Sequence, residues 1–205
     1  MEHKTQQDVR MIFKVGAFLA FIMLSYLGLR SYKTSVEKMK TNFCIEEIIE
    51  IVQIIKEVHE KERDYGEFDY KIATKLKIFP KRMNKEGFSE PVNSYMGGVD
   101  LYYSSLSDVQ PRSAFEVSFQ GLSKFGCVHL MKTGGLIDIG LIAVGGFSTP
   151  TPAGVLDEVY GDTKQEDIKK ANIFKAQNVM YVSDDKINNA CSCKEDVCSV
   201  VWKFR

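Results

Sequence analysis

Apolar positions along this chain follow two different patterns, a helical one in the first third and an alternating one in the rest. Met11 to Leu29 reads MIFKVGAFLAFIMLSYLGL, nineteen residues that contain a single charge, Lys14. Beyond it, apolar residues recur mostly at steps of three and four, with glutamates and a lysine between them, which predicts an amphipathic helix. These positions are Val36, Met39, Phe43, Ile48, Val52, Ile55 and Val58.

The two apolar stretches can form one continuous helix. No proline occurs before Pro80 and no glycine lies between Gly28 and Gly66, so nothing in the sequence forces a break. We therefore expect one rod from about residue 11 to residue 63. The alternative is a separate second helix, because Thr34-Ser35-Val36-Glu37 has the spacing of a capping box.

The stretch 11–29 predicts a transmembrane helix. Its uncharged part, residues 15–29, spans roughly 22 Å at helical rise against a hydrocarbon thickness of ~30 Å, so Lys14 would reach to one interface. A secretory signal peptide is the main alternative, but Leu27-Gly28-Leu29-Arg30 is a poor cleavage site. Lysines and arginines are balanced on the two sides, so charge does not set the orientation.

The later part of the chain predicts short strands and a helix. Strands are expected at Val99–Tyr103, at Ile137–Val144, and at Cys198–Phe204. Phe115, Val117 and Phe119 alternate with Glu116, Ser118 and Gln120, which is typical of a half-buried antiparallel strand. Short helices are expected around Tyr70–Leu76 and over Gly121–Lys132, the latter capped by Ser123. The order predicts an α+β head whose sheet is covered by the amphipathic half of the long helix.

Composition narrows the function and the compartment. The chain has 205 residues with 27 basic and 27 acidic side chains, so no excess charge points to nucleic acid. Four of the five cysteines lie between Cys127 and Cys198, which favours an oxidising compartment and places the head outside the cytoplasm. Four cysteines allow three pairings. Cys44 is the odd one, and we expect a packed thiol rather than a bridge between subunits.

The sequence contains only weak candidates for a catalytic, phosphate-binding or metal site. Gly121-Leu122-Ser123-Lys124-Phe125-Gly126 lacks the G-x-S-x-G spacing of a nucleophile elbow, and Gly135–Gly140 lacks the lysine of a phosphate loop. A zinc site from Cys127, His129, Cys191, Cys193 and Cys198 is the rival to disulfides, but its C-x-H and C-x-C steps depart from the usual spacing. We expect no catalytic, metal or cofactor site, and hence no enzyme.

Several separate segments of the chain form a combination that points to one family. A basic segment ends at Gly16, an apolar helix begins at Ala17, and the run AFEVSFQGLS at 114–123 precedes Cys127. Residues 182–191 lead to another cysteine, Cys191. Together these segments resemble type IVb pilins, the subunits of toxin-coregulated and conjugative thin pili, in which similar stretches lead to the two disulfide cysteines. The resemblance implies a Cys127–Cys191 disulfide, and we favour Cys193–Cys198 as a second one that clips the turn before the last strand.

The resemblance also implies a domain division and a set of partners. Residues 1–16 would be a cytoplasmic leader, residues 17–63 the pilin-type helix, and residues 64–205 the periplasmic head. The apolar helix would be stored in the inner membrane and transferred to an extracellular filament built from copies of this chain or other pilins. Leader peptidase would cut between Gly16 and Ala17, and the assembly machinery would be a further partner.

One position departs from the family pattern. With Ala17 as the first mature residue, the fifth is Phe21, where the family usually has a glutamate that pairs with a neighbour's N-terminal amine. Its loss removes a device that sets register in a dry interface, so normal cleavage and the role of major subunit are both in question. We expect a minor or atypical structural pilin that serves filament assembly, adhesion or conjugation. The alternatives are a membrane-tethered binding or adhesion domain and a type II secretion pseudopilin.

Overall fold

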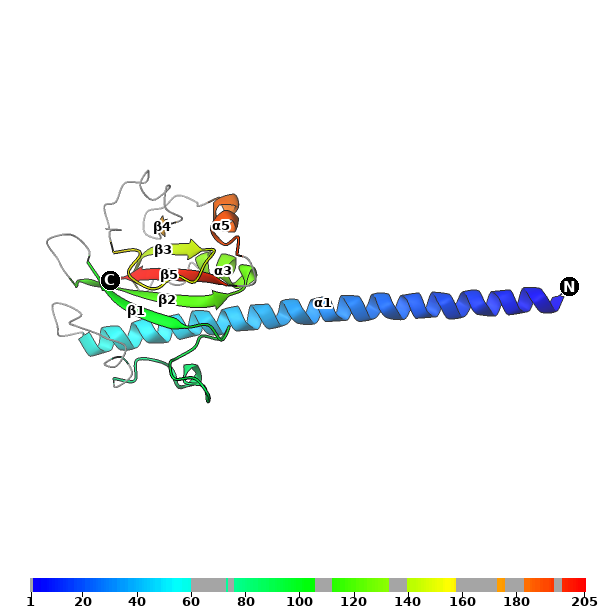
Figure 1. The fold of residues 1–205 in the computed structure, drawn as a ribbon, viewed down its shortest axis with the longest axis horizontal. Coiled ribbons are helices and arrows are strands. Elements are labelled where there is room, and N and C mark those ends of the chain that lie inside the picture. Colours follow the sequence, from blue (N-terminus) through cyan, green and yellow to red (C-terminus); the bar gives the residue numbers. More distant parts are fainter. Residues whose placement is uncertain are drawn as a thin grey trace. The chain divides into compact units, whose positions relative to one another are not determined.

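The computed structural model describes residues 2–59, 73, 76–105, 112–132, 140–157, 173–175, 183–193 and 197–205. Side chains are described from Gly16 onward within these ranges, except those of 173–175. The chain divides into two compact units, Met1–Met39 and Lys40–Arg205. The first unit contains only part of helix α1 (Glu2–His59), and the second is the head (Figure 1).

Helix α1 runs without interruption through the predicted capping box. The hydroxyl of Thr34 donates to the carbonyl oxygen of Arg30 at 3.0 Å, four residues back in the same helix. A threonine that bonds backward in this way is inside a helix and does not cap a new one. The expectation of one continuous helix is confirmed over the described residues, and the separate second helix is wrong.

Within the described residues, the head is built on a five-stranded antiparallel sheet in the order β1-β2-β5-β3-β4. Its strands are β1 (Val99–Ser104), β2 (Ala114–Leu122), β3 (Leu141–Phe147), β4 (Ile173–Lys175) and β5 (Cys198–Phe204). The C-terminal strand β5 lies in the centre, paired with β2 through Val117↔Trp202 and with β3 through Val144↔Trp202. The head also contains the 3-10 turn η1 (Lys81–Met83), helix α3 (Lys124–Met131) and helix α5 (Asp184–Ala190). Figure 1 shows α3 and α5 beside the sheet.

The main core lies between the inner face of the sheet and the head portion of α1. Trp202 and Phe119 are fully buried and meet edge to face, with ring centroids 5.3 Å apart. Phe115 stacks on Phe204 at 5.5 Å. Helix α1 contributes buried side chains to the same cluster, which are Cys44, Ile48, Ile51, Val52 and Ile55. The α+β class and the cover of the sheet by the amphipathic helix are confirmed.

The buried stripe of α1 is rotated from the predicted one. Met39, Phe43 and Val58 are 51%, 41% and 40% exposed, although the three- and four-residue steps assigned them to the apolar face. Thr41 and Glu47 are buried instead, at 1% each. The rotation has a polar cause, because both side chains hydrogen-bond to the segment that follows η1.

Most other expected elements lie where the pattern placed them. Strands β1, β2 and β5 match their predictions, and α3 begins after Ser123, whose hydroxyl accepts from the amide of Gly126 at 3.1 Å. The third predicted strand corresponds to β3, which runs from Leu141 to Phe147 and so ends later than expected. The predicted helix at 70–76 and the first part of 137–144 lie largely outside the described residues.

Candidate functional site

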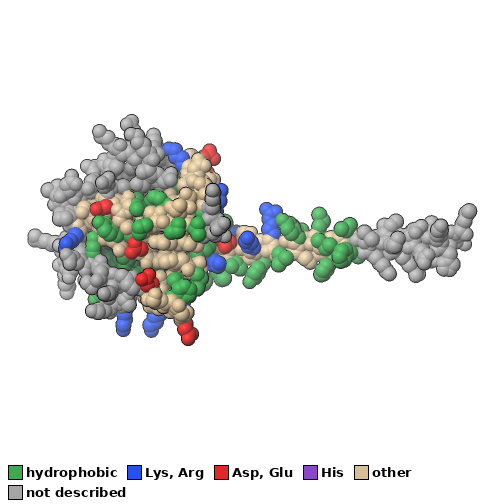
Figure 2. Space-filling view, viewed as in Figure 1, with side chains coloured by type: hydrophobic (Ala, Val, Ile, Leu, Met, Phe, Trp, Pro, Cys, Tyr) green, Lys and Arg blue, Asp and Glu red, His purple; other side chains and the backbone are tan. Residues whose placement is uncertain are grey.

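The first unit presents a run of exposed apolar side chains. Between Phe18 and Tyr32, ten large apolar residues of α1 are each 47–72% exposed. They occupy all sides of the helix and not one stripe, and Figure 2 shows them as green side chains along the described part of this segment. They are Phe18, Leu19, Phe21, Ile22, Met23, Leu24, Tyr26, Leu27, Leu29 and Tyr32.

A helix that is apolar on every side needs an apolar surrounding. No Asp, Glu, Lys or Arg occurs from Val15 to Leu29, so the segment offers packing surface and no charge. Among the described residues, none of the helices meets the length and hydropathy needed to cross a membrane. The predicted segment 11–29 begins with residues whose side chains are not described.

The expected leader junction lies on this same helix. Gly16 and Ala17 are both exposed, and a side chain added at Gly16 would meet no atom within 4 Å. Phe21, at the position expected for a glutamate, is 69% exposed. The junction is therefore sterically open in this chain, and its cleavage stays a prediction.

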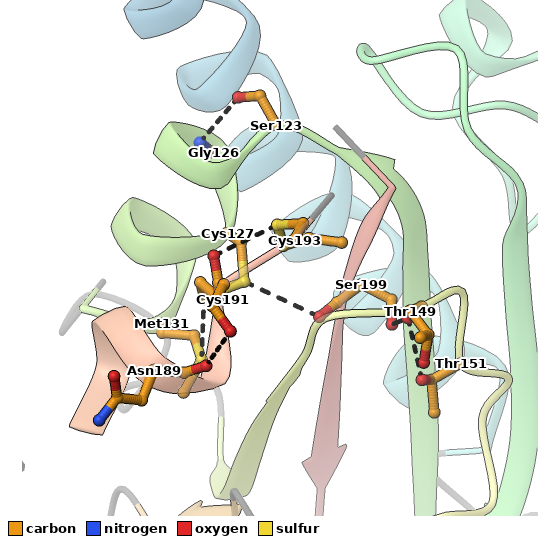
Figure 3. Close-up of a disulfide and its surroundings, with 12 residues drawn as sticks. Ser123, Gly126, Cys127, Met131, Thr149, Thr151, Asn189, Cys191, Cys193 and Ser199 are labelled. Carbon is orange, nitrogen blue, oxygen red and sulfur yellow. Dashed lines mark hydrogen bonds between the residues drawn. A yellow bond between two sulfur atoms is a disulfide. The ribbon is translucent and has the colours of Figure 1, made fainter. Parts of the chain in front are cut away.

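Two disulfides close the C-terminal part of the head. Cys127 of α3 is bonded to Cys191, the residue after α5, with their Cα atoms 5.8 Å apart (Figure 3). Cys193 is bonded to Cys198 at the start of β5, with Cα atoms 5.2 Å apart. The expectation of a disulfide-bonded head is confirmed. Because all four thiols are used, the zinc alternative has lost its sulfur ligands, and the described residues contain no cluster suited to a metal.

The first disulfide sits in a closely packed corner of the head. Cys127 and Cys191 are fully buried, and Figure 3 shows Met131 beside them. Gly146 of β3 allows this approach, because a Cβ there would overlap the sulfur of Met131 and lie 3.4 Å from the sulfur of Cys191. On the surface, the ammonium of Lys132 pairs with Asp184 at 2.7 Å and ties the end of α3 to α5.

A buried carboxylate fixes α1 to the segment after η1. Glu47 accepts hydrogen bonds from the hydroxyl of Ser94 at 2.7 Å and from its amide at 3.2 Å, and Arg82 lies 3.8 Å away. Burial raises the pKa of Glu47, and Ser94 and Arg82 oppose that shift. Burial, and then the nearby Glu47, raise the pKa of the Cys44 thiol, so Cys44 is a packed neutral thiol.

Tyr95 connects three parts of the head at the same end. Its hydroxyl lies 2.8 Å from that of Thr41, and the Lys40 ammonium is 5.3 Å from its ring centroid. The ring also lies against Gly126 of α3, where a Cβ would come within 2.7 Å of it. The sequence did not predict these contacts of Glu47 and Tyr95. Glu47 lies among other charged residues of the helix, so its position in the sequence indicated exposure to solvent.

The residues weighed for catalysis have structural roles where they are described. Ser123 caps α3, and His129 stacks on Phe125 with ring centroids 4.7 Å apart. The glycine run at 135–140 lies, apart from Gly140, outside the described residues.

The fold is that of a type IV pilin. The chain is similar to the crystal structure of TcpA, a type IV pilin from Vibrio cholerae El Tor biotype, with a TM-score of 0.54 and 11% sequence identity. The match covers 82% of this chain and 99% of TcpA. At this identity the likeness shows the fold alone. Among curated proteins, none matches the sequence.

The family follows from the sequence match. The model of the PilS family, described as PilS N terminal, matches residues 38–193, which is more than half of the chain. This protein belongs to that family and is a type IVb pilin-like protein. The family resemblance inferred from residues 114–123 and 182–191 is confirmed.

Proposed function

We propose that this protein is a structural subunit of a type IV pilus or a related filament. The observation that carries the proposal is the combination of an exposed, uncharged apolar helix at residues 17–29 with a disulfide-bonded pilin-type head. Such a helix is stable only in lipid or packed among similar helices. A filament core offers the second surrounding, and the inner membrane offers the first before assembly.

The proposal includes a location and a processing step. The head lies in the periplasm, where its disulfides form, and the subunit later joins an extracellular filament. Leader peptidase cuts between Gly16 and Ala17. Copies of this chain or other pilins then surround the apolar helix. Pilins act by packing, so the proposed work involves no bond chemistry apart from this cleavage.

Phe21 supports a minor or atypical role within that filament. A glutamate at the fifth mature position would need a partner inside an apolar core, because an unpaired buried charge is costly. Phe21 removes that need and also removes the register that the pair supplies. A subunit of this kind suits a few special positions, such as a tip that serves adhesion or conjugation.

N-terminal sequencing of membrane-extracted protein, from cells that carry the assembly genes, tests the processing step. We expect Ala17 as the first residue. Gly16→Val should block cleavage, while the matched variant Gly28→Val should not, since both glycines have open space around them on the same helix. An intact Met1 in the unaltered protein would contradict processing and favour a membrane-tethered binding domain.

Incorporation into sheared filaments tests the role of Phe21. We expect Phe21→Glu to be tolerated or to increase incorporation, because it restores the partner of a neighbour's amine. Phe18→Glu places the same charge one turn away on a side chain of similar exposure, 64% against 69%, and should abolish incorporation. Equal loss of incorporation in both variants would show that a glutamate at position 21 does not set the register between subunits.

A further inference from the structure

Residues 149–157 cross the outer face of the sheet, and hydrogen bonds between their backbone and side chains of the strands hold them there. We call this segment the strap. Its backbone groups bond to side chains that project from β1, β2 and β5, and the strap forms no part of a described strand. The hydroxyl of Ser118 donates to the carbonyl oxygen of Thr151 at 2.5 Å. The hydroxyl of Ser199 donates to the carbonyl oxygen of Thr149 at 2.7 Å, as Figure 3 shows.

A buried pair of opposite charges holds the other half of the strap. Glu116 and Lys203 are register partners on β2 and β5, and neither is exposed. Glu116 accepts from the amides of Gly154 at 2.7 Å and Leu156 at 3.1 Å. The ammonium of Lys203 donates to the carbonyl oxygens of Leu156 at 3.1 Å and Asp157 at 2.9 Å.

The carboxylates around this pair complete the attachment. Asp100 of β1 accepts from the amide of Ala153 at 3.1 Å. Asp157 of the strap accepts from the hydroxyl of Ser104 at 3.0 Å, and the same hydroxyl lies 3.0 Å from Glu116. The polar attachment therefore spans three neighbouring strands.

Apolar anchoring of the strap is small by comparison. Leu156 is its one side chain in the outer cluster of the described residues, where it joins Ile142, Ala143 and Val201. Val155 is 41% exposed. Segments with few buried apolar contacts open at lower free energy than core strands do.

Opening the strap would also relieve the two buried charges. Burial lowers the pKa of Lys203 to about 8 and raises the pKa of Glu116, which means that both groups are held away from water at a cost. Water would replace the hydrogen bonds that the strap loses. The main-chain ladders of β2 and β5 do not depend on any strap contact, because those ladders pair with each other and with β1 and β3.

We propose that the strap is a lid that lifts from the sheet as a unit while the sheet and both disulfides stay intact. The open state uncovers a polar surface made of Glu116, Ser118, Ser199 and Lys203, with the ring of Tyr102, which covers Gly154 in the closed state, at its edge. The geometry points to a second conformation of the head that is reached without unfolding it.

Amide hydrogen exchange on the full chain in detergent micelles tests this lid. The amides of Ala153, Gly154 and Leu156 all donate to side-chain carboxylates and serve as reporters. We expect them to exchange on the order of 100-fold faster than the amides of β5, with little dependence on denaturant, as local opening requires. Equal exchange rates and equal denaturant dependence would overturn the proposal, because the strap would then open only with global unfolding.

Variants of the attachment sharpen the test. Lys203→Met should speed exchange of the reporters by about tenfold, the effect of losing roughly 1.4 kcal/mol, while β5 amides change little. Lys85→Met removes a lysine whose ammonium bonds to the sulfur of Met96, and it should leave the reporters unchanged. Should Lys203→Met fail to fold, Ser199→Ala removes one strap bond with less disturbance. Faster exchange of β5 and strap amides together would contradict an independent lid.

Discussion

The two faces of the head's sheet are buried by different means. The inner face packs Trp202, Phe119 and Phe204 against aliphatic side chains of α1. The outer face is also buried, yet its positions hold Glu116, Ser118, Ser199 and Lys203. One face is therefore held by apolar area, and the other by hydrogen bonds to the strap together with the small outer cluster around Leu156 and Val201. The burial of a sheet face therefore does not show whether apolar packing or hydrogen bonding stabilises it.

This difference predicts unequal tolerance to change. Apolar burial is roughly proportional to area, so its loss leaves a cavity that nothing refills. Side-chain bonds to the strap exchange with water when they break, so each is worth about 0.5–1.5 kcal/mol net, and about 1.5–3 kcal/mol where the group is charged. The inner face should therefore dominate global stability, and the outer face should govern local opening.

The largest effect is expected at the centre of the inner face. Trp202→Ala should lower the free energy of unfolding by about 3–5 kcal/mol, because it empties a fully buried site against Phe119. Val201→Ala, the neighbour that faces the outer cluster, is the matched control and should cost about half as much or less. Chemical denaturation in detergent micelles measures both, and equal losses would break the comparison.

Removal of the longer disulfide should come next. Cys127→Ser with Cys191→Ser should cost about 2–4 kcal/mol, since the bond closes a loop of 64 residues. The pair Cys193→Ser and Cys198→Ser removes a disulfide with a sequence separation of 5 residues. It should lower the free energy of unfolding by less, because shorter loops restrict the unfolded chain less. Denaturation midpoints without reductant test this order, and the reverse order would contradict the loop-entropy account.

The buried charges of the outer face should give stability a pH dependence. Lys203 has a folded pKa of about 8 against an ordinary value of 10.5, so the unfolded state binds more protons between these values. Stability should therefore rise with pH across that window, on the order of 1–3 kcal/mol. The stability gained when Lys203 loses its proton is complete above the unfolded pKa and is lost as pH falls through about 8.

Glu116 acts in the opposite direction at lower pH. Its folded pKa is raised above the ordinary 4.5, so its contribution is present below that value and is lost as pH rises through the folded pKa. Denaturation curves collected from pH 4 to pH 10.5, with Lys203→Met as the comparison, measure both slopes. A variant that keeps the full alkaline rise would show that another group causes it.

The smallest effect is expected at the cap of α3. Ser123→Ala should cost about 1 kcal/mol, because the amide of Gly126 loses its acceptor. Ser123→Asp keeps an acceptor at the same position and should restore most of the loss. A melting temperature unchanged by the alanine variant would show that the disulfide at Cys127 holds this helix without its cap.

The apolar core was predictable because its signal is periodic. Phe115, Val117 and Phe119 alternate with period two, and that pattern placed β2 and its inner face directly. The same alternation predicted that Glu116 and Ser118 would face solvent, and here it was wrong. The partners of these residues include backbone groups of a proline-containing loop more than thirty positions away, and no local pattern reports such a contact.

The helix face was predicted less well for a related reason. Hydrophobic steps assigned Phe43 to the core, while Glu47 is the residue that lies inside. The burial of Glu47 depends on Ser94 and Arg82, which the helix sequence does not contain. The three-residue strand β4 was also missed, because a strand that short leaves no period to detect.

The Cys127–Cys191 bond has a consequence for chain scission. A protease that cuts once anywhere between those two positions yields two polypeptides that remain covalently joined. The central strand β5 lies beyond Cys191, so the fragment that carries it stays tethered to α3 and cannot diffuse away. A nicked molecule would migrate as one band until a reducing agent separates the pieces, so a chain cut once in this interval would keep its parts together.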